Sequence, residues 1–132
     1  MGFYKKGPLL KLVLPNGREL SYVKPAIIDG NITYEGTLQT SGAWGRIESY
    51  GPKLVENMVQ ATARDCLAMA IDRLEKAGFP VVFHVHDEVI CEVPIGVSSA
   101  KELGAIMSET IDWAKELPLR ADAYECEYYR KD

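Results

Sequence analysis

Alternating apolar and polar positions near the start of the chain predict two β-hairpins. The apolar run Leu9–Leu14 leads into the turn residues Asn16-Gly17, and the chain returns through Glu19–Val23. Asn-Gly is a preferred pair for a two-residue hairpin turn, because both residues tolerate positive φ. A second hairpin is predicted from Ala26–Ile28 and Ile32–Tyr34, around a turn that contains glycine. The first 35 residues should therefore form antiparallel strands.

The stretch from Glu35 to Ser49 is rich in Gly, Ser and Thr, and this composition predicts a loop over residues 36–50. It carries Trp44 and Arg46. An exposed Trp44 beside Arg46 would suit contact with a phosphate chain. A buried Trp44 that fixes the loop to the core is the commoner arrangement, and it is the one we expect.

The longest predicted element is a helix that begins near Gly51-Pro52, where proline suits the first turn, and ends at Gly78. At about 100° per residue, one side is apolar and forms the expected core face: Val55, Met58, Val59, Thr62, Cys66, Met69 and Ala70. The other side begins with long polar side chains, here called the polar stripe, and continues with Leu67 and Ile71. The polar stripe consists of Lys53, Asn57, Gln60 and Arg64. It suits either a solvated helix face or a DNA groove, because amides and guanidinium groups donate to acceptors on base edges.

Two β-branched apolar segments, Val81–Val85 and Val89–Val93, predict a buried hairpin with a two-residue turn at His86-Asp87. His-Asp is a poor choice for such a turn, whose central residues need positive φ. Local rules of this kind tend to be broken where function requires it. The pairing would place Glu88 opposite Val85. His86, Asp87 and Glu88 would then gather at one sheet end, where carboxylate oxygens can hold a divalent cation.

The last third of the chain predicts a helix and a strand. Ser99 and Glu102 have the spacing of a capping box, and apolar residues at helical spacing follow as far as Trp113. Alternation from Leu119 to Tyr129 predicts a final strand with a bulge. The order is typical of an α+β fold, an antiparallel sheet of hairpins with two helices packed on one face. We expect residues 1–132 to form a single domain, with hairpins at 1–35, a loop at 36–50 and a core at 51–132.

Composition narrows the class of protein. The chain has 132 residues, of which 47% are hydrophobic and 26% charged, as expected for one globular domain. Its net charge of -4 differs from the positive charge of a typical nucleic-acid binder, so DNA contact would need a local patch or a bound metal. Three cysteines without Cys-x-x-Cys spacing indicate reduced thiols in a cytoplasmic protein. Neither a signal peptide nor a long apolar run is present, so no membrane partner is expected.

The residues Val85-His86-Asp87-Glu88-Val89, in a strand-turn-strand context, resemble the third conserved palm motif of family A DNA polymerases. This is the group of bacterial DNA polymerase I and many phage replicases. Four further stretches are similar, in the same order, to members of phage type: Leu14–Leu20, Tyr50–Val55, Glu56–Asp65, and Leu119 through Arg130. The resemblance covers the chain from about Leu9 to its end. It implies the C-terminal palm portion of a polymerase of phage or prophage type.

The resemblance implies catalytic roles at the predicted turn. Asp87 matches the catalytic aspartate that helps to hold two Mg²⁺ ions, and Glu88 stands beside it as an auxiliary carboxylate. His86 matches the histidine that meets the primer terminus. In a two-metal reaction the ions activate the attacking hydroxyl and stabilise the departing pyrophosphate.

The resemblance also implies DNA contacts. Gln60 matches the helix glutamine that reaches the minor groove of the primer-template DNA, with Asn57 and Arg64 as companions. Minor-groove acceptors on A and T are nearly interchangeable, so such donors suit an enzyme that checks pair geometry without preferring a sequence. Lys53 and Arg46 complete the candidate DNA contacts. Primer-template DNA and deoxynucleoside triphosphates would be the partners of the full polymerase in DNA replication.

Two family motifs have no counterpart in this sequence: an earlier palm motif with a second essential aspartate, and the fingers helix that binds the incoming nucleotide. We therefore expect the isolated chain to be inactive, with an incomplete Mg²⁺ site. A noncatalytic or split-gene remnant that acts as an interaction or DNA-binding module is an alternative. A metallohydrolase using His84, His86 and Asp87 is disfavoured, because the chain has only two histidines. Palm surfaces exposed by truncation also predict homo-oligomers.

Overall fold

The computed structural model describes residues 1–131, and the chain divides into two compact units, Met1–Thr62 and Ala63–Asp132. The long helix α1 (Gly51–Lys76) contributes residues to both units. Helices and antiparallel strands together make this an α+β protein. That the chain is a single domain, and that both helices pack on one sheet face, stay predictions. No helix among the described residues is long and apolar enough to cross a membrane.

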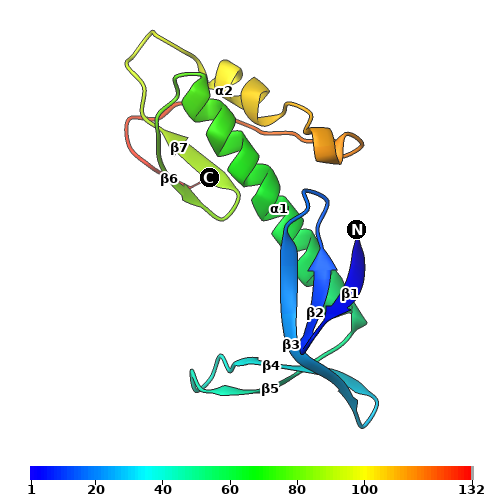
Figure 1. Cartoon of the computed structure of the whole chain (residues 1–132). Coiled ribbons are helices and arrows are strands. Elements are labelled where there is room, and N and C mark those ends of the chain that lie inside the picture. Colours follow the sequence, from blue (N-terminus) through cyan, green and yellow to red (C-terminus); the bar gives the residue numbers. More distant parts are fainter. Residues whose placement is uncertain (132) are drawn as a thin grey trace. The chain divides into compact units, whose positions relative to one another are not determined.

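The first unit contains a five-stranded antiparallel sheet whose strands follow one another in sequence order, drawn in blue to cyan in Figure 1. The strands are β1 (Gly2–Lys6), β2 (Leu9–Val13), β3 (Glu19–Ile28), β4 (Asn31–Thr37) and β5 (Trp44–Ser49). Both predicted hairpins are confirmed. In the second hairpin, the turn residues Asp29 and Gly30 have φ of 51° and 79°, and a type I′ turn requires positive φ at both positions. The sequence pattern does not predict β1, whose residues are all exposed and so show no buried face.

The predicted loop over residues 36–50 is wrong, because β4 and β5 pair through most of it, down to Thr37 opposite Trp44. The glycines that suggested a loop are paired with each other in the sheet, Gly36 opposite Gly45. A Cβ at Gly36 would lie 3.0 Å from Cδ1 of Ile47, and one at Gly45 would lie 2.9 Å from Cδ1 of Leu38. Glycine in a strand often marks such close approach. These two glycines make room for apolar side chains.

Arg46 fixes an irregularity in the sheet. Strand β3 shifts register between Val23 and Ala26, and Lys24 adopts a φ of 43° there. The guanidinium group of Arg46 donates through Nη1 to the carbonyl oxygen of Lys24 at 2.9 Å and to Oγ1 of Thr33 at 3.2 Å. A bulge leaves backbone groups without their usual partner in the neighbouring strand, and the guanidinium group supplies one for the Lys24 carbonyl. Arg46 therefore serves a structural role in the first unit, in addition to its candidate DNA contact.

The expectation of a buried Trp44 is wrong, because its side chain is 61% exposed. It lies at the start of β5, and its Nε1 donates to Oε2 of Glu35 at 3.2 Å. Oε1 of Glu35 accepts from Nη2 of Arg46 at 3.2 Å and from Nζ of Lys24 at 3.3 Å. The hydrogen bonds from Trp44 and Lys24 lower the pKa of the Glu35 carboxyl group below its ordinary 4.5. Trp44 is thus held by a carboxylate on the sheet surface.

Because the pKa of Glu35 is lowered on folding, the ionised carboxylate stabilises the fold above pH 4.5, and this contribution is lost as the pH falls below that value. Glu35→Gln should therefore be less stable than the wild type at pH 7, and the difference should shrink at pH 3. Thermal unfolding followed by circular dichroism at both pH values measures it. Glu48→Gln, at an exposed position of β5, is the control. A Glu35→Gln deficit that is equal at both pH values would contradict the network.

Helix α1 ends where the sequence predicts, and its end shows why. Gly78 has a φ of 85°, and its N–H donates to the carbonyl of Glu75 at 3.1 Å. The N–H of Phe79 donates to the carbonyl of Leu74 at 2.9 Å. This pair of bonds is a Schellman motif. Such a motif is usually accompanied by an apolar contact between its first and last residues, here Leu74 and Phe79. Leu74 and Phe79 are correspondingly 0% and 6% exposed.

The predicted core face of α1 is partly wrong. Val55 and Val59 are 54% and 57% exposed, whereas Leu67, assigned to the opposite side, is 7% exposed. Ala70 is buried as predicted, at 6%. A single apolar face is expected when a helix packs on one layer, but α1 belongs to two units, and different faces are buried along its length.

The second unit contains the two-stranded antiparallel hairpin β6 (Val81–Val85) and β7 (Glu88–Cys91), the helix α2 (Ala100–Met107) and the 3₁₀-helix η1 (Asp112–Ala114). The capping box is confirmed, with Ser99 and Glu102 bonded reciprocally. The prediction that the helix continues to Trp113 is wrong. The guanidinium group of Arg73 donates to the carbonyl oxygens of Glu109 and Thr110, at 2.8 Å each. Carbonyls beyond a helix end need such partners, because no further helical turn donates to them.

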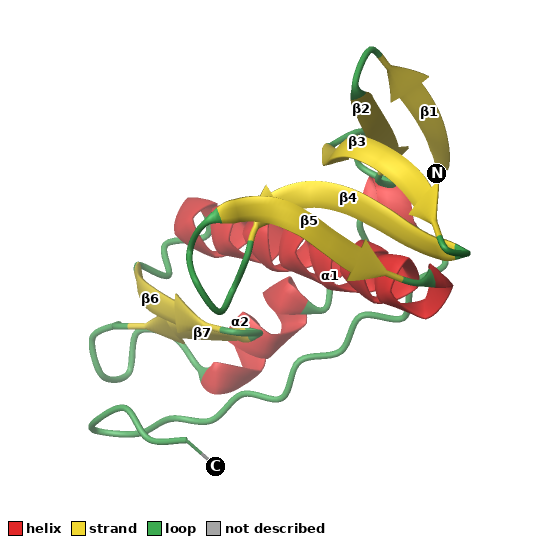
Figure 2. Cartoon of the chain, turned by 90° about the horizontal axis from the view of Figure 1, so that it is seen from below, coloured by secondary structure: helices red, strands yellow, loops and turns green. Residues whose placement is uncertain are grey.

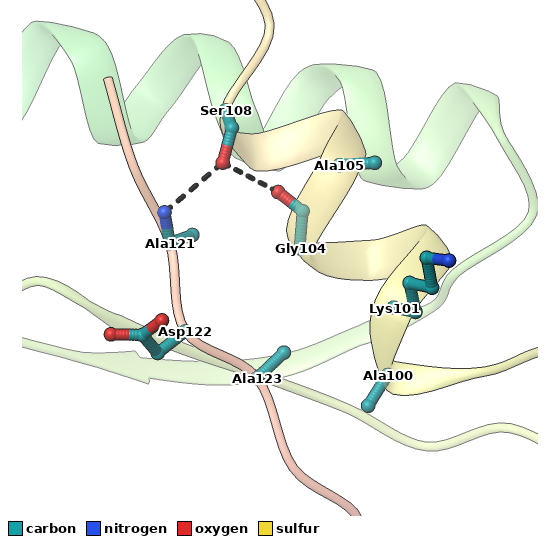
Figure 3. Close-up of a pocket in the computed structure, with 8 residues that line it drawn as sticks. All are labelled: Ala100, Lys101, Gly104, Ala105, Ser108, Ala121, Asp122 and Ala123. Carbon is teal, nitrogen blue, oxygen red and sulfur yellow. Dashed lines mark hydrogen bonds between the residues drawn. The ribbon is translucent and has the colours of Figure 1, made fainter. Parts of the chain in front are cut away.

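The predicted strand from Leu119 to Tyr129 is also wrong, since the described tail has no strand and is drawn as loop in Figure 2. Its backbone bonds to a side chain instead: the N–H of Ala121 donates to Oγ of Ser108 at 3.0 Å, and this hydroxyl donates to the carbonyl of Gly104 at 2.7 Å. Figure 3 shows the tail beside the small residues of α2. A Cβ at Gly104 would lie 3.4 Å from the carbonyl oxygen of Ala121. The alternation therefore reflects packing on a helix.

Candidate functional site at the tip of the β6–β7 hairpin

The register predicted for the central hairpin is confirmed. Val85 pairs with Glu88 and His84 with Val89, so His86 and Asp87 form a two-residue turn. A shift between Val81 and Phe83 adds an irregularity away from the tip. His86, Asp87 and Glu88 therefore lie together at the end of the hairpin, as the sequence predicts.

His86 has a backbone conformation that its residue type does not favour. Its φ is 53°, whereas Asp87 is not among the described residues with positive φ. The first central position of such a turn is usually glycine or asparagine. A side chain held at positive φ costs of the order of 1–3 kcal/mol, and positions of this kind cluster at functional sites. The turn is therefore a local departure from folding rules, at the place where the resemblance puts catalytic residues.

The expectation that this hairpin is buried is wrong. Val82 and Phe83 are 55% and 39% exposed, and both His86 and Asp87 are exposed. Strand β7 is half-buried throughout. A continuous apolar run is typical of a strand covered on both faces, but in this two-stranded ribbon three consecutive residues of β6, Val82, Phe83 and His84, are exposed. The Asp87 carboxylate is accordingly open to a binding partner.

Tyr129 in the C-terminal tail contacts this site, although no pattern in the sequence points to this contact. Its hydroxyl donates to Oε2 of Glu88 at 3.0 Å. Its ring packs edge-to-face on Phe83, with 5.2 Å between centroids and 76° between planes. The hydrogen bond to the Glu88 carboxylate raises the pKa of the Tyr129 phenol above its ordinary 10.0. Tyr129 lies 41 positions from Glu88, so no local pattern could pair them.

The chemistry of these donors suits Mg²⁺, but their number is small. Mg²⁺ prefers oxygen ligands in near-octahedral geometry and keeps several waters when few carboxylates are present. Asp87 and Glu88 supply carboxylate oxygens at the tip. Among the described residues no group of three or more His, Cys, Asp or Glu side chains is placed to hold a metal ion. The Mg²⁺ site therefore stays a prediction, in which these two residues would be part of a larger ligand set.

The polar stripe of α1 does not behave as one solvated face. Asn57 is half-buried, and its Nδ2 donates to the hydroxyl of Tyr22 at 3.3 Å. Lys53 pairs with Glu56 at 2.9 Å, which raises the pKa of the lysine. Gln60 and Arg64 are exposed. The stripe therefore contains two engaged side chains and two open ones.

Gln60 and Asn57 line the same shallow groove of the first unit, about 360 Å³ in volume. Tyr22 and Tyr34 form its aromatic part, edge-to-face with 5.1 Å between centroids. Two of the four stripe residues, Asn57 and Gln60, thus lie here with aromatic side chains of β3 and β4. Gln60 belongs to the first unit and Asp87 to the second. That they share one DNA-facing surface stays a prediction.

The sequence resembles part of a known enzyme. The chain is homologous to one segment of a DNA polymerase. The relative is the DNA polymerase of Bacillus phage SP02, which is 51% identical over 135 aligned positions that cover 98% of this chain and 20% of that polymerase. The chain thus spans about a fifth of the length of the curated relative it matches. No family model matches it, and no solved structure does.

Substitutions at His86 test the strain in the turn. His86→Val should lower the free energy of unfolding by about 1–3 kcal/mol, because a β-branched residue is disfavoured at positive φ. His86→Gly should be at least as stable as the wild type at this position. Urea unfolding measures both. His84→Val, on the same exposed ribbon but within the strand, is the matched control. Equal stability of His86→Val and His84→Val would show that the turn is unstrained.

Proposed function

We propose that this chain is the C-terminal palm portion of a family A DNA polymerase of phage type and contributes one carboxylate cluster to nucleotidyl transfer. Two observations support the proposal. The segment match to a phage DNA polymerase extends over nearly the whole chain. The two-residue turn presents Asp87 at an exposed tip, with Glu88 next to it. The second observation carries the argument, because metal-dependent phosphoryl chemistry needs carboxylates that a substrate can reach.

In this proposal each tip residue has a separate task. Asp87 and Glu88 would hold Mg²⁺, which when bound activates the primer hydroxyl and stabilises the leaving pyrophosphate. The exposed Asp87 would provide the direct ligand, and Glu88, with one oxygen bonded to Tyr129, would be auxiliary. His86 would meet the primer terminus, since it lies exposed in the turn. Further ligands would come from segments of the polymerase outside this chain.

The duplex would be held by donors on the first unit and α1. Gln60 is exposed, and its amide is free to donate to minor-groove acceptors. Asn57 keeps its carbonyl oxygen, although its amide nitrogen donates to Tyr22. Arg64 supplies an exposed guanidinium group. Lys53 and Arg46 would contribute as partly neutralised cations, because both already pair with glutamates.

A chimaera tests the proposal directly. When this chain replaces the matching segment of the SP02 polymerase, the product should extend a DNA primer in the presence of Mg²⁺. Asp87→Ala in the chimaera should lower the extension rate at least about 100-fold, because the metal ion that this carboxylate would hold contributes several kcal/mol of charge stabilisation. Asp122→Ala, at an exposed acid of the tail, should leave the rate unchanged. Full activity of the Asp87→Ala chimaera would refute the assignment.

The isolated chain should not extend a primer, since Asp87 and Glu88 alone are too few ligands to hold two Mg²⁺ ions. A gel assay with labelled primer-template DNA, all four deoxynucleoside triphosphates and Mg²⁺ measures this. The active chimaera provides the positive control. An Mg²⁺-dependent product that disappears in Asp87→Ala would show that the chain is catalytically complete.

A further inference from the structure

The C-terminal tail is attached to the second unit at three points. The backbone N–H of Ala121 donates to Ser108 at the end of α2, and Oε1 of Glu125 accepts from the backbone N–H of Ala100 at the start of α2, at 3.1 Å. The third attachment is Tyr129 on the hairpin. Figure 3 shows the first attachment. The tail therefore runs along the short helix and ends on the candidate site.

Tyr129 contacts the hairpin in two ways, through its ring and through its hydroxyl. The ring lies against Phe83 of β6, which fixes where the hydroxyl is held. The hydroxyl reaches Oε2 of Glu88 at the first position of β7. One tail residue thus touches both strands of the hairpin, immediately beside the turn that carries Asp87.

This arrangement has a consequence for Glu88. A glutamate side chain has three rotatable bonds, and ordering it costs of the order of 1–2 kcal/mol of conformational entropy. The Tyr129 hydroxyl donates to Oε2, and no described residue forms a hydrogen bond with Oε1. Hydrogen-bonded partners that orient ligating carboxylates typically change metal affinity 10–100-fold when they are removed.

We propose that Tyr129 is a positioning residue that holds the Glu88 carboxylate in one orientation beside Asp87, so that Oε1 can join Asp87 in binding a divalent cation. The inference rests on the proposed function of these two carboxylates. It assigns to the tail a role in the site that neither the turn nor the family resemblance gives it. Phe83 supports the same role by fixing the tyrosine ring.

The first part of the test needs no metal. In the full chain, three-bond coupling constants should report a single side-chain rotamer for Glu88. Tyr129→Phe keeps the ring on Phe83 but removes the hydroxyl, so Glu88 should then average over rotamers. Tyr128→Phe is the matched control, because Tyr128 is 72% exposed and immediately precedes Tyr129. Unchanged Glu88 couplings in Tyr129→Phe would overturn the proposal.

The second part uses Mn²⁺ alone as a paramagnetic probe of the same proteins. Mn²⁺ should broaden the amide signals of residues 86–88 in the wild type and in Tyr128→Phe, and Asp87→Ala should abolish this. Tyr129→Phe should need about tenfold more Mn²⁺ for equal broadening. Equal Mn²⁺ dependence of Tyr129→Phe and the wild type would overturn the positioning role while leaving the carboxylate site intact. No broadening in the wild type would overturn cation binding by these residues, and the positioning role with it.

Discussion

The candidate site depends on a two-residue turn that its own residues do not favour. Because Val85 pairs with Glu88, only His86 and Asp87 remain to reverse the chain, and His86 adopts positive φ to do so. The short turn keeps both carboxylates within one residue of the tip. A longer loop would relieve the strain but would leave Asp87 on a more mobile segment. The strained turn therefore costs backbone energy but holds the Asp87 carboxylate in a fixed place. Strained backbone positions commonly occur at functional sites for this kind of reason.

Features set by neighbouring residues could be predicted from the sequence. The turns at Asn16-Gly17 and Asp29-Gly30, the capping box at Ser99 and the helix end at Gly78 each follow from the conformational preferences of a few residues. The hairpin register at Asp87 was predictable from the two β-branched apolar segments that flank the turn, although His86 and Asp87 do not favour it. Local chemistry thus gave the elements and the candidate carboxylates.

Features set by distant contacts could not be predicted. Gly36 and Gly45 suggest a loop, but in the structure they are strand residues, and a side chain at either position would clash with Ile47 or Leu38. The tail alternates like a strand, yet it packs on α2 through Ser108. Tyr129 reaches Glu88 from the far end of the sequence. In each case a tertiary contact overrides the pattern that composition or periodicity suggests.

The polar stripe of α1 shows the same limit within one helix. Helical spacing groups Asn57 with Gln60, but the sheet of the first unit engages Asn57 through Tyr22 and leaves Gln60 exposed. The aromatic pair of Tyr22 and Tyr34 lies in the same groove. The proposed function would require this groove and the carboxylate tip to contact the same primer-template duplex.

Paramagnetic relaxation enhancement tests most directly whether position 60 and residues 86–88 contact the same duplex. A nitroxide attached at position 60, in a chain whose native cysteines are replaced by serine, broadens the amide signals of nearby residues. With primer-template DNA bound, we expect this label to broaden the signals of residues 86–88. Full signal intensity at residues 86–88 in the same complex would contradict it.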